Sequence, residues 1–132
     1  MKRWIWIDAA DATAYHAELI AEHGGSAGLR DRGLLESALA RPQNLDAYGE
    51  PTAFELAAAY AFGIAKNHPF VDGNKRVAFV ASVTFLESNG YQFAATEEDA
   101  AITFLGLAGA KVTEQDLSRW LEARSRKATR KR

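Results

Sequence analysis

A nine-residue stretch, HPFVDGNKR at residues 68–76, gathers side chains that could carry out a group-transfer reaction. Histidine is the side chain with a reference pKa of about 6.5, so His68 is a candidate to take a proton from a hydroxyl group at neutral pH. Asp72 offers a hard carboxylate oxygen of the kind that binds Mg²⁺ together with phosphate oxygens and water. Arg76 can pair with phosphate in a forked geometry. The stretch therefore combines a base, a metal ligand and a charge clamp.

A helix start is predicted directly after Gly73, because a long apolar run with helical spacing follows it. The first amides of a helix have no intrahelical partner and lie at the positive end of its dipole, so the amides of Asn74, Lys75 and Arg76 can bind an anion. These parts suit phosphoryl transfer, which depends mainly on positioning and charge stabilisation. By spacing alone, an ordinary Asp-Gly turn followed by surface charges stays an open alternative. The loop is not a Walker A sequence, because no Gly-Lys-Ser or Gly-Lys-Thr is present.

Two apolar helices are expected to hold this stretch between them. Thr52 and Glu55 have the spacing of a capping box, which predicts the start of a helix that is apolar almost all round and therefore buried. Pro69 ends that helix, so His68 should lie where the chain leaves helical geometry. The apolar spacing of residues 77–89 predicts a second buried helix after the stretch.

Further helices are predicted from N-terminal caps followed by apolar spacing. The expected caps are Asp8 or Asp11, Asp31, Thr96 and Thr113. The first of these helices should stop at Gly24 and the second at Pro42. Residues 4–7 and 91–93 suit short extended segments. We therefore expect a compact all-α bundle of about six helices with a short extended N-terminal segment.

Residues 41–50 are predicted to form the main irregular loop, because turn-forming residues interrupt any helical period there. From the residues alone, two interpretations are equally compatible with this loop. It is either a surface connector or a loop beside the active site that holds a substrate segment.

The composition is that of one soluble domain. The chain has 132 residues, 48 % of them hydrophobic, which is ample for a single core. It has no cysteine, so disulfides and thiolate metal sites are excluded, and its three histidines lie far apart, which disfavours a histidine metal site. No run reaches the roughly 18 apolar residues of a membrane span, and no export signal is recognised. We expect a cytoplasmic protein without a membrane partner.

The net charge of -1 conceals an asymmetry. Residues 1–118 contain 9 Lys+Arg and 16 Asp+Glu, whereas residues 119–132 contain 7 basic residues and only Glu122 on the acidic side. An acidic body argues against specific DNA binding, since phosphate contacts need a basic face. The basic end is expected to be a solvated, frayed tail.

The stretch HPFVDGNKR resembles the signature loop of the Fic/Doc (Fido) proteins. Lys75 matches the Doc, or death-on-curing, branch, since Fic enzymes carry a second glycine at that position. The similarity extends to residues 24–31, 33–42 and 89–91 and covers about residues 4–123. It implies a Fido domain at residues 1–123, with a flap loop, followed by a basic and disordered tail at residues 124–132.

The resemblance also implies roles for individual residues. His68 would be the base, Phe70 an anchor in the core, Asp72 the Mg²⁺ ligand and Arg76 a catalytic phosphate-binding residue that also contacts the nucleotide. The rest of the nucleotide-binding turn would be Gly73, Asn74 and Lys75. The flap that docks the target would consist of Asn44, Leu45, Asp46, Ala47, Tyr48 and Gly49.

Doc toxins use ATP and Mg²⁺ to phosphorylate a threonine of elongation factor Tu, which stops translation, and an antitoxin neutralises them by binding near the site. The resemblance therefore implies a protein kinase toxin with a translation factor and an antitoxin as partners. Lys75 favours this outcome, because a side chain there should narrow the pocket in which Fic enzymes seat the inner phosphates. Gly73 is more Fic-like, since the best-known Doc toxin has alanine there, so adenylyl transfer stays open.

Two further points concern regulation. A non-catalytic, antitoxin-binding corepressor is the alternative from another functional class. The self-inhibitory pattern of some Fic proteins, Ser or Thr followed four residues later by Glu and then Gly or Asn, is only approached at Ser118 and Glu122, because Ala123 follows. We therefore expect restraint by a separate antitoxin rather than within the chain.

Overall fold

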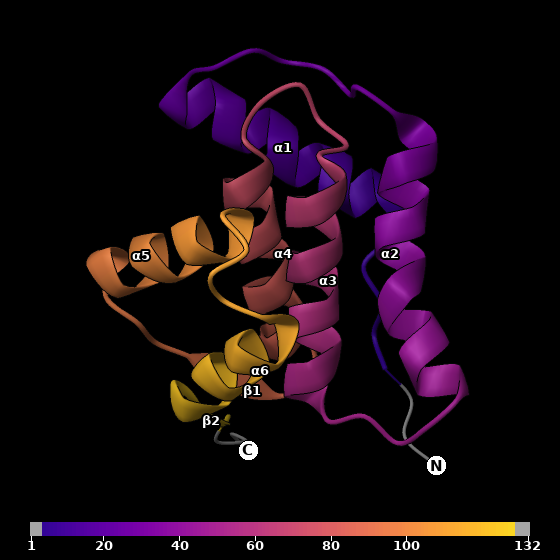
Figure 1. Ribbon diagram of the computed structural model, residues 1–132, viewed down its shortest axis with the longest axis vertical. Helices are drawn as coiled ribbons and strands as arrows, with labels where there is room; N and C mark the ends of the chain where they lie inside the picture. Colours follow the sequence, from indigo (N-terminus) through magenta and orange to yellow (C-terminus); the bar gives the residue numbers. More distant parts are fainter. Residues whose placement is uncertain (1–3, 129–132) are drawn as a thin grey trace, which may run out of the picture.

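The computed structural model describes residues 4–128, which form six helices and one two-stranded sheet (Figure 1). None of the helices in this range is both long enough and apolar enough to cross a membrane. The expectation of a compact helical bundle with about six helices is confirmed. In chain order the elements are α1 (Ala9–His23), α2 (Arg32–Ala47), α3 (Ala53–Asn67), α4 (Asn74–Ser88), β1 (Tyr91–Phe93), α5 (Glu97–Ala108), α6 (Glu114–Ala123) and β2 (Ser125–Lys127).

Helix α3 is the centre of the bundle, as its apolar sequence predicts. Eleven of its fifteen residues are buried, and α2, α4 and α6 pack around it (Figure 1). Gly63 lets α2 approach closely, because a Cβ atom at this position would lie 3.1 Å from Cα and 3.2 Å from Cβ of Ala38. The small residues at this crossing therefore fix α2 against α3, and α3 ends at the predicted active-site stretch.

Helix starts follow the predicted caps. Asp8, Asp31, Thr52, Thr96 and Thr113 each accept a hydrogen bond from the amide three residues further on. The caps of α1, α3 and α6 are complete capping boxes. Such caps typically contribute about 1 kcal/mol each, and they explain why five helix starts were readable from the sequence.

The prediction that Pro42 ends the second helix is wrong. Helix α2 continues through Pro42 to Ala47, so most of the expected loop at residues 41–50 is helical. The reason is the position of Pro42 in a buried stripe with Leu35, Ala38 and Leu39, at spacing i, i+3, i+4 and i+7. Packing of this stripe outweighs the backbone hydrogen bond that a proline inside a helix forfeits.

The N-terminal segment crosses α3 and α4 in an extended form, as expected, without pairing into a sheet. The rings of Trp4 and Trp6 both lie 5.9 Å from the ring of Phe85. The Asn89 side chain accepts a hydrogen bond from Ile5 N (2.8 Å) and donates one to Ile5 O (3.1 Å). These contacts therefore hold residues 4–6 against the C-terminal half of α4 and the residue that follows it.

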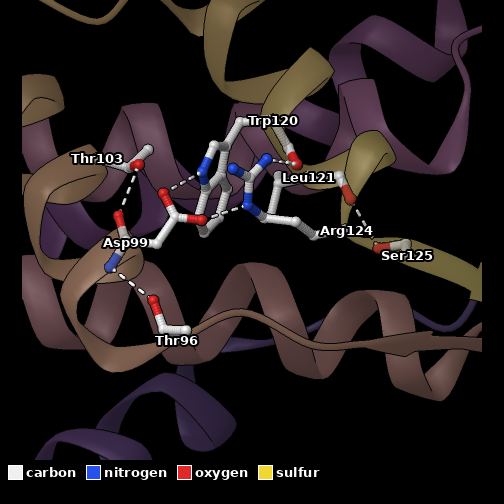
Figure 2. A network of polar contacts seen from close by, with 7 residues as sticks. All are labelled: Thr96, Asp99, Thr103, Trp120, Leu121, Arg124 and Ser125. Atoms are coloured by element: carbon white, nitrogen blue, oxygen red, sulfur yellow. Dashed lines mark hydrogen bonds and ion pairs between the residues drawn. The ribbon is translucent and has the colours of Figure 1, made fainter.

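A polar network joins the start of α5 to the end of α6 (Figure 2). Asp99 accepts hydrogen bonds from the indole Nε1 of Trp120 (3.1 Å) and from Arg124 Nε, with which it also forms an ion pair. The Trp120 hydrogen bond and then the Arg124 contact hold the pKa of Asp99 below its ordinary value. Ser125 Oγ donates to the Leu121 carbonyl in the same network, so the chain beyond α6 is held in place.

The C-terminal segment is more ordered than predicted. The sequence indicated a disordered tail from residue 124, but β2 pairs antiparallel with β1, with Gln92 opposite Arg126, and Ala128 N donates to Gly90 O (2.9 Å). The anchoring of Arg124 by Asp99 brings these residues to the free edge of β1, a long-range contact that no short sequence pattern reports. Residues 129–132 of the predicted tail lie outside the described residues, and the division at residue 123 stays a prediction.

Tyr60 provides a test of the core. Its buried hydroxyl accepts a hydrogen bond from Ile7 N (2.9 Å) and donates one to Ile7 O (3.3 Å), and burial raises its pKa to about 12. Replacement of Tyr60 by Phe leaves the buried Ile7 amide unpaired and should lower the free energy of unfolding by about 1–3 kcal/mol, measured by urea denaturation at pH 7. Because the pKa is raised above 10.0, the stabilisation of the parent should persist up to about pH 10 and be lost as pH rises towards about 12. Tyr48→Phe, at a side chain that is 91 % exposed, should change neither result.

Candidate active site

The loop between α3 and α4 holds His68 at the end of α3. His68 is the C-cap residue, with left-handed backbone angles (φ 51, ψ 56), and its amide donates to Ile64 O (3.1 Å). The guanidinium of Arg30 donates to the last carbonyls of the helix, from Nε to His68 O (2.8 Å) and from Nη2 to Asn67 O (2.9 Å). A left-handed conformation costs about 1–2 kcal/mol for a residue with a Cβ, so Arg30 stabilises a backbone geometry that His68 would not adopt by itself.

Asn74 closes the loop from the other side. This residue begins α4 and is buried, and its side chain satisfies both backbone groups of Phe70: Oδ1 accepts from Phe70 N (3.0 Å) and Nδ2 donates to Phe70 O (2.9 Å). Asn74 Nδ2 also lies 3.2 Å from His68 Nδ1. Since an amide nitrogen can only donate, His68 Nδ1 accepts, and the neutral ring carries its proton on Nε2. Phe70 itself is 1 % exposed, which agrees with its predicted place in the core.

The N-terminus of α4 differs from the other helix starts in the described range. Its N-cap is Gly73, in a left-handed conformation (φ 77, ψ 14), and no side chain caps it. The first intrahelical hydrogen bond runs from Val77 N to Gly73 O (3.0 Å), so the amides of residues 74–76 precede it. The side chains of Lys75 and Arg76 are exposed beside these amides. Amides and cations together form a site suited to phosphate oxygens.

Asp72 lies at the same end of α4 with an exposed, ionised side chain. Its Oδ1 accepts from Gly73 N (2.8 Å) and its Oδ2 from Ser26 N (3.3 Å). These two amide hydrogen bonds, followed by the positive charge of Arg76, lower the pKa of Asp72 below its ordinary value. The carboxylate is therefore available as a metal ligand at neutral pH.

Residues 4–128 contain no cluster of three or more His, Cys, Asp or Glu side chains that could hold a metal ion by themselves. A cation at Asp72 would take its other ligands from substrate phosphates and water. Mg²⁺ is usually held in this way, by one or two carboxylates together with phosphate oxygens and several waters. The donor set at this end of α4 therefore fits Mg²⁺ bound together with a nucleotide.

Residues 24–31 run beside the loop, a neighbour that the sequence analysis did not assign to the site. Leu29 and Phe70 form an isolated antiparallel bridge. Val71 N donates to Gly28 O (3.0 Å), and Arg30 N donates to Pro69 O (2.7 Å). The feature of the sequence that could have pointed to this segment is its closely spaced glycines. Gly24, Gly25 and Gly28 all have positive φ in the structure.

His16 of α1 lies beneath the loop and was also not predicted as part of the site. The imidazole ring stacks on Phe70, with 4.2 Å between ring centroids and an interplanar angle of 11°. Its Nε2 lies 2.9 Å from the carbonyl oxygen of Asp72. A histidine within the buried face of a helix was the only signal for this contact in the sequence.

The proposed target-docking flap is not at the site. Asn44, Leu45, Asp46 and Ala47 belong to the end of α2, and Tyr48 is its C-cap. Because α2 and α3 are antiparallel neighbours (Figure 1), residues 44–49 lie at the start of α3. His68 lies at the other end, about 22 Å away at 1.5 Å per residue over fifteen residues. Four of these residues line a separate groove of about 900 Å³ together with Glu55 and Ser118, namely Asn44, Leu45, Tyr48 and Gly49.

The comparison with known proteins agrees with this geometry. Residues 6–86 match the sequence profile of the Fic/DOC family. The chain belongs to this family. The matched region contains His16, the glycine-rich segment and the whole α3–α4 loop, so every part of the site described above lies within it.

The chain is similar to "Toxin Doc" of Mycolicibacterium smegmatis (strain ATCC 700084 / mc(2)155). The two proteins are 50 % identical over 76 residues, which are 54 % of this chain and 57 % of that relative. The similarity therefore spans little more than half of the relative's length.

Gly25 offers a test of how Asp72 is held. Its φ is +111°, and a Cβ atom there would lie 2.7 Å from Asp72 Oδ2. Gly25→Ala should therefore displace the carboxylate from Ser26 N and raise the Asp72 pKa towards its ordinary value, as measured by NMR titration of the side-chain carboxyl. Gly24→Ala is the matched control: it has a similar backbone strain (φ +80°), but its Cβ would meet nothing within 4 Å. Equal changes of the Asp72 pKa in both variants would contradict this account.

Proposed function

We propose that this protein is a Doc-type toxin kinase that transfers the γ-phosphate of ATP to a hydroxyl of a translation factor, a threonine of elongation factor Tu being the expected target. The observation that carries the proposal is the uncapped N-terminus of α4, whose first residue, Asn74, contacts His68 (3.2 Å) and is closely flanked in the chain by an ionised Asp72 and by Arg76. This combination suits the binding of a polyphosphate beside a base.

In the proposed reaction the hydroxyl oxygen of the target attacks the γ-phosphorus. The bond between that phosphorus and the oxygen bridging the β- and γ-phosphates breaks, ADP leaves, and the hydroxyl proton passes to His68. The amides of residues 74–76 and the guanidinium of Arg76 stabilise the negative charge of the phosphates. Mg²⁺ bound at Asp72 would neutralise further phosphate charge when it is present.

The hydrogen bond from Asn74 determines which ring nitrogen of His68 carries the proton before the substrates bind. In the resting geometry the neutral His68 ring carries its proton on Nε2, because Nδ1 accepts from Asn74 Nδ2. Acceptance of a hydroxyl proton at Nε2 requires the ring proton to be on Nδ1, so the contact with Asn74 must give way when substrates bind. We propose that target and nucleotide bring about this change together.

Target docking is better proposed for residues 24–31 than for residues 44–49. The former segment lies antiparallel to the motif through the bridge between Leu29 and Phe70, and residues 21–33 are all exposed. A peptide that lies along this segment would bring its hydroxyl to the end of α4. Residues 44–49 cannot do so from the opposite end of α3.

A toxin requires an antitoxin, so we propose a cognate antitoxin as a second partner, in line with the name of the Mycolicibacterium relative. Control from within the chain is not supported by α6. Ser118 of that helix lines the groove beside Glu55 at the start of α3, and the candidate base lies beyond the other end of α3. ATP and translation factors are cytoplasmic, so we propose the cytoplasm as the site of action.

Adenylyl transfer on the same scaffold is the second candidate, favoured by the left-handed glycine at position 73. Incubation of the protein with elongation factor Tu and ATP labelled on either the γ- or the α-phosphate separates the two reactions. We expect label from γ alone, and none with His68→Ala because the base is lost, a decrease of at least about 100-fold. Transfer of the α-label alone would refute the kinase.

The non-catalytic corepressor is distinguished by growth. Expression of the parent in a bacterial host should arrest growth, and expression of His68→Ala to the same level should not. Equal arrest by both proteins would favour a role that does not depend on the base.

Lys75 is expected to determine which phosphate is presented. Its side chain is exposed in the first turn of α4, next to the free amides. Lys75→Gly removes this side chain and should increase transfer of the α-label relative to the γ-label in the assay above. Lys75→Met, which retains most of the side-chain volume without the charge, tests whether bulk or charge is responsible. An unchanged ratio in Lys75→Gly would mean that Lys75 does not select the phosphate.

A further inference from the structure

We infer that His16 is a positioning residue of the phosphotransfer site, which orients the Asp72–Gly73 peptide and, through it, the metal-binding carboxylate. The inference rests on the proposed function, since it assigns a role relative to the Mg²⁺–nucleotide complex. His16 belongs to α1, 56 residues before Asp72, and its hydrogen bond goes to the backbone carbonyl of Asp72 rather than to a group proposed to bind the nucleotide directly.

The contact itself is directional. His16 is only 4 % exposed, and its Nε2 lies 2.9 Å from the Asp72 carbonyl oxygen. A carbonyl oxygen can only accept, so Nε2 must carry the proton and donate it. The ring is held in place by its stacking on Phe70, which is itself bonded to Asn74 on both backbone groups. The donor therefore has a fixed direction.

This hydrogen bond determines where the Asp72 carboxylate is held. Asp72 C=O and Gly73 N–H belong to one planar trans peptide, in which the two groups point in opposite directions. His16 holds the carbonyl on the inner side, so the Gly73 amide points outwards. There it donates to Asp72 Oδ1 (2.8 Å). If His16 did not donate this hydrogen bond, the peptide between Asp72 and Gly73 could rotate. The Gly73 amide would then no longer donate to the Asp72 carboxylate.

Two functions of His16 can be separated by substitution. The stacked ring contributes packing against Phe70, and the Nε2–H group contributes orientation of the peptide. His16→Phe keeps a ring and removes the donor. His16→Gln places a donor at a similar reach, and His16→Met has a similar length to Gln without any donor, so the pair Gln and Met differs mainly in the hydrogen bond.

The test uses the full chain, Mn²⁺ as a probe in place of Mg²⁺, and a non-hydrolysable ATP analogue. Nucleotide affinity is measured by titration calorimetry with Mn²⁺ and with EDTA, and bound Mn²⁺ by electron paramagnetic resonance. His16→Phe and His16→Met should reduce the gain in nucleotide affinity that Mn²⁺ provides by about 10- to 100-fold, as loss of an outer-shell partner of a metal site does. His16→Gln should retain most of this gain.

Asp72→Asn is the reference that separates failure of the inference from failure of the proposed function. If the parent shows no gain with Mn²⁺, or if Asp72→Asn leaves the gain unchanged, both are wrong. If Asp72→Asn abolishes the gain but His16→Phe and His16→Met retain it, the role of His16 alone is refuted. The role of His16 would also be refuted if Mn²⁺ increased nucleotide affinity equally little in His16→Gln and His16→Met while both variants kept near-parent melting temperatures. Packing of the ring, rather than its hydrogen-bond donor, would then be responsible.

Discussion

The buried amide of Asn74 is the interaction on which the arrangement of the site depends. One side chain satisfies the N–H and C=O of Phe70 and contacts the His68 ring. Buried backbone groups without partners cost about 1–3 kcal/mol each, so this single residue decides whether the chain between α3 and α4 can turn inside the protein. Because Phe70 is thereby fixed in the core, the exposed residues on either side of it, His68 and Asp72, are brought to one surface.

Much of this arrangement was predictable from local sequence. Proline after His68 ends α3, the glycine at position 73 begins α4, and hydroxyl or carboxylate caps mark the other helices, since each of these effects acts within a few residues. The segments that complete the site were not predictable in the same way. Arg30 contacts His68 from 38 residues away and His16 contacts Asp72 from 56, and no periodic pattern connects such pairs.

The two errors in the fold have the same origin. Pro42 was read as a local stop, whereas the burial of its helix face decides the outcome. Residues 125–127 have no strand pattern of their own, but Arg124 is held by Asp99 and thus delivers them to β1. The error in the location of the flap follows from the first, because a loop was assumed where α2 continues along α3.

The reliance of the site on distant segments has a consequence for the folding reaction. α3 and α4 are sequence neighbours and can associate early, since contacts that close short loops form fastest. The contacts of His16 and Arg30 with the loop close much longer stretches of chain and should form late along the folding pathway. A folding intermediate with a native-like α3–α4 hairpin would therefore have its helices in place and yet lack the orientation of His68 and Asp72, so chemical competence belongs to the completed fold.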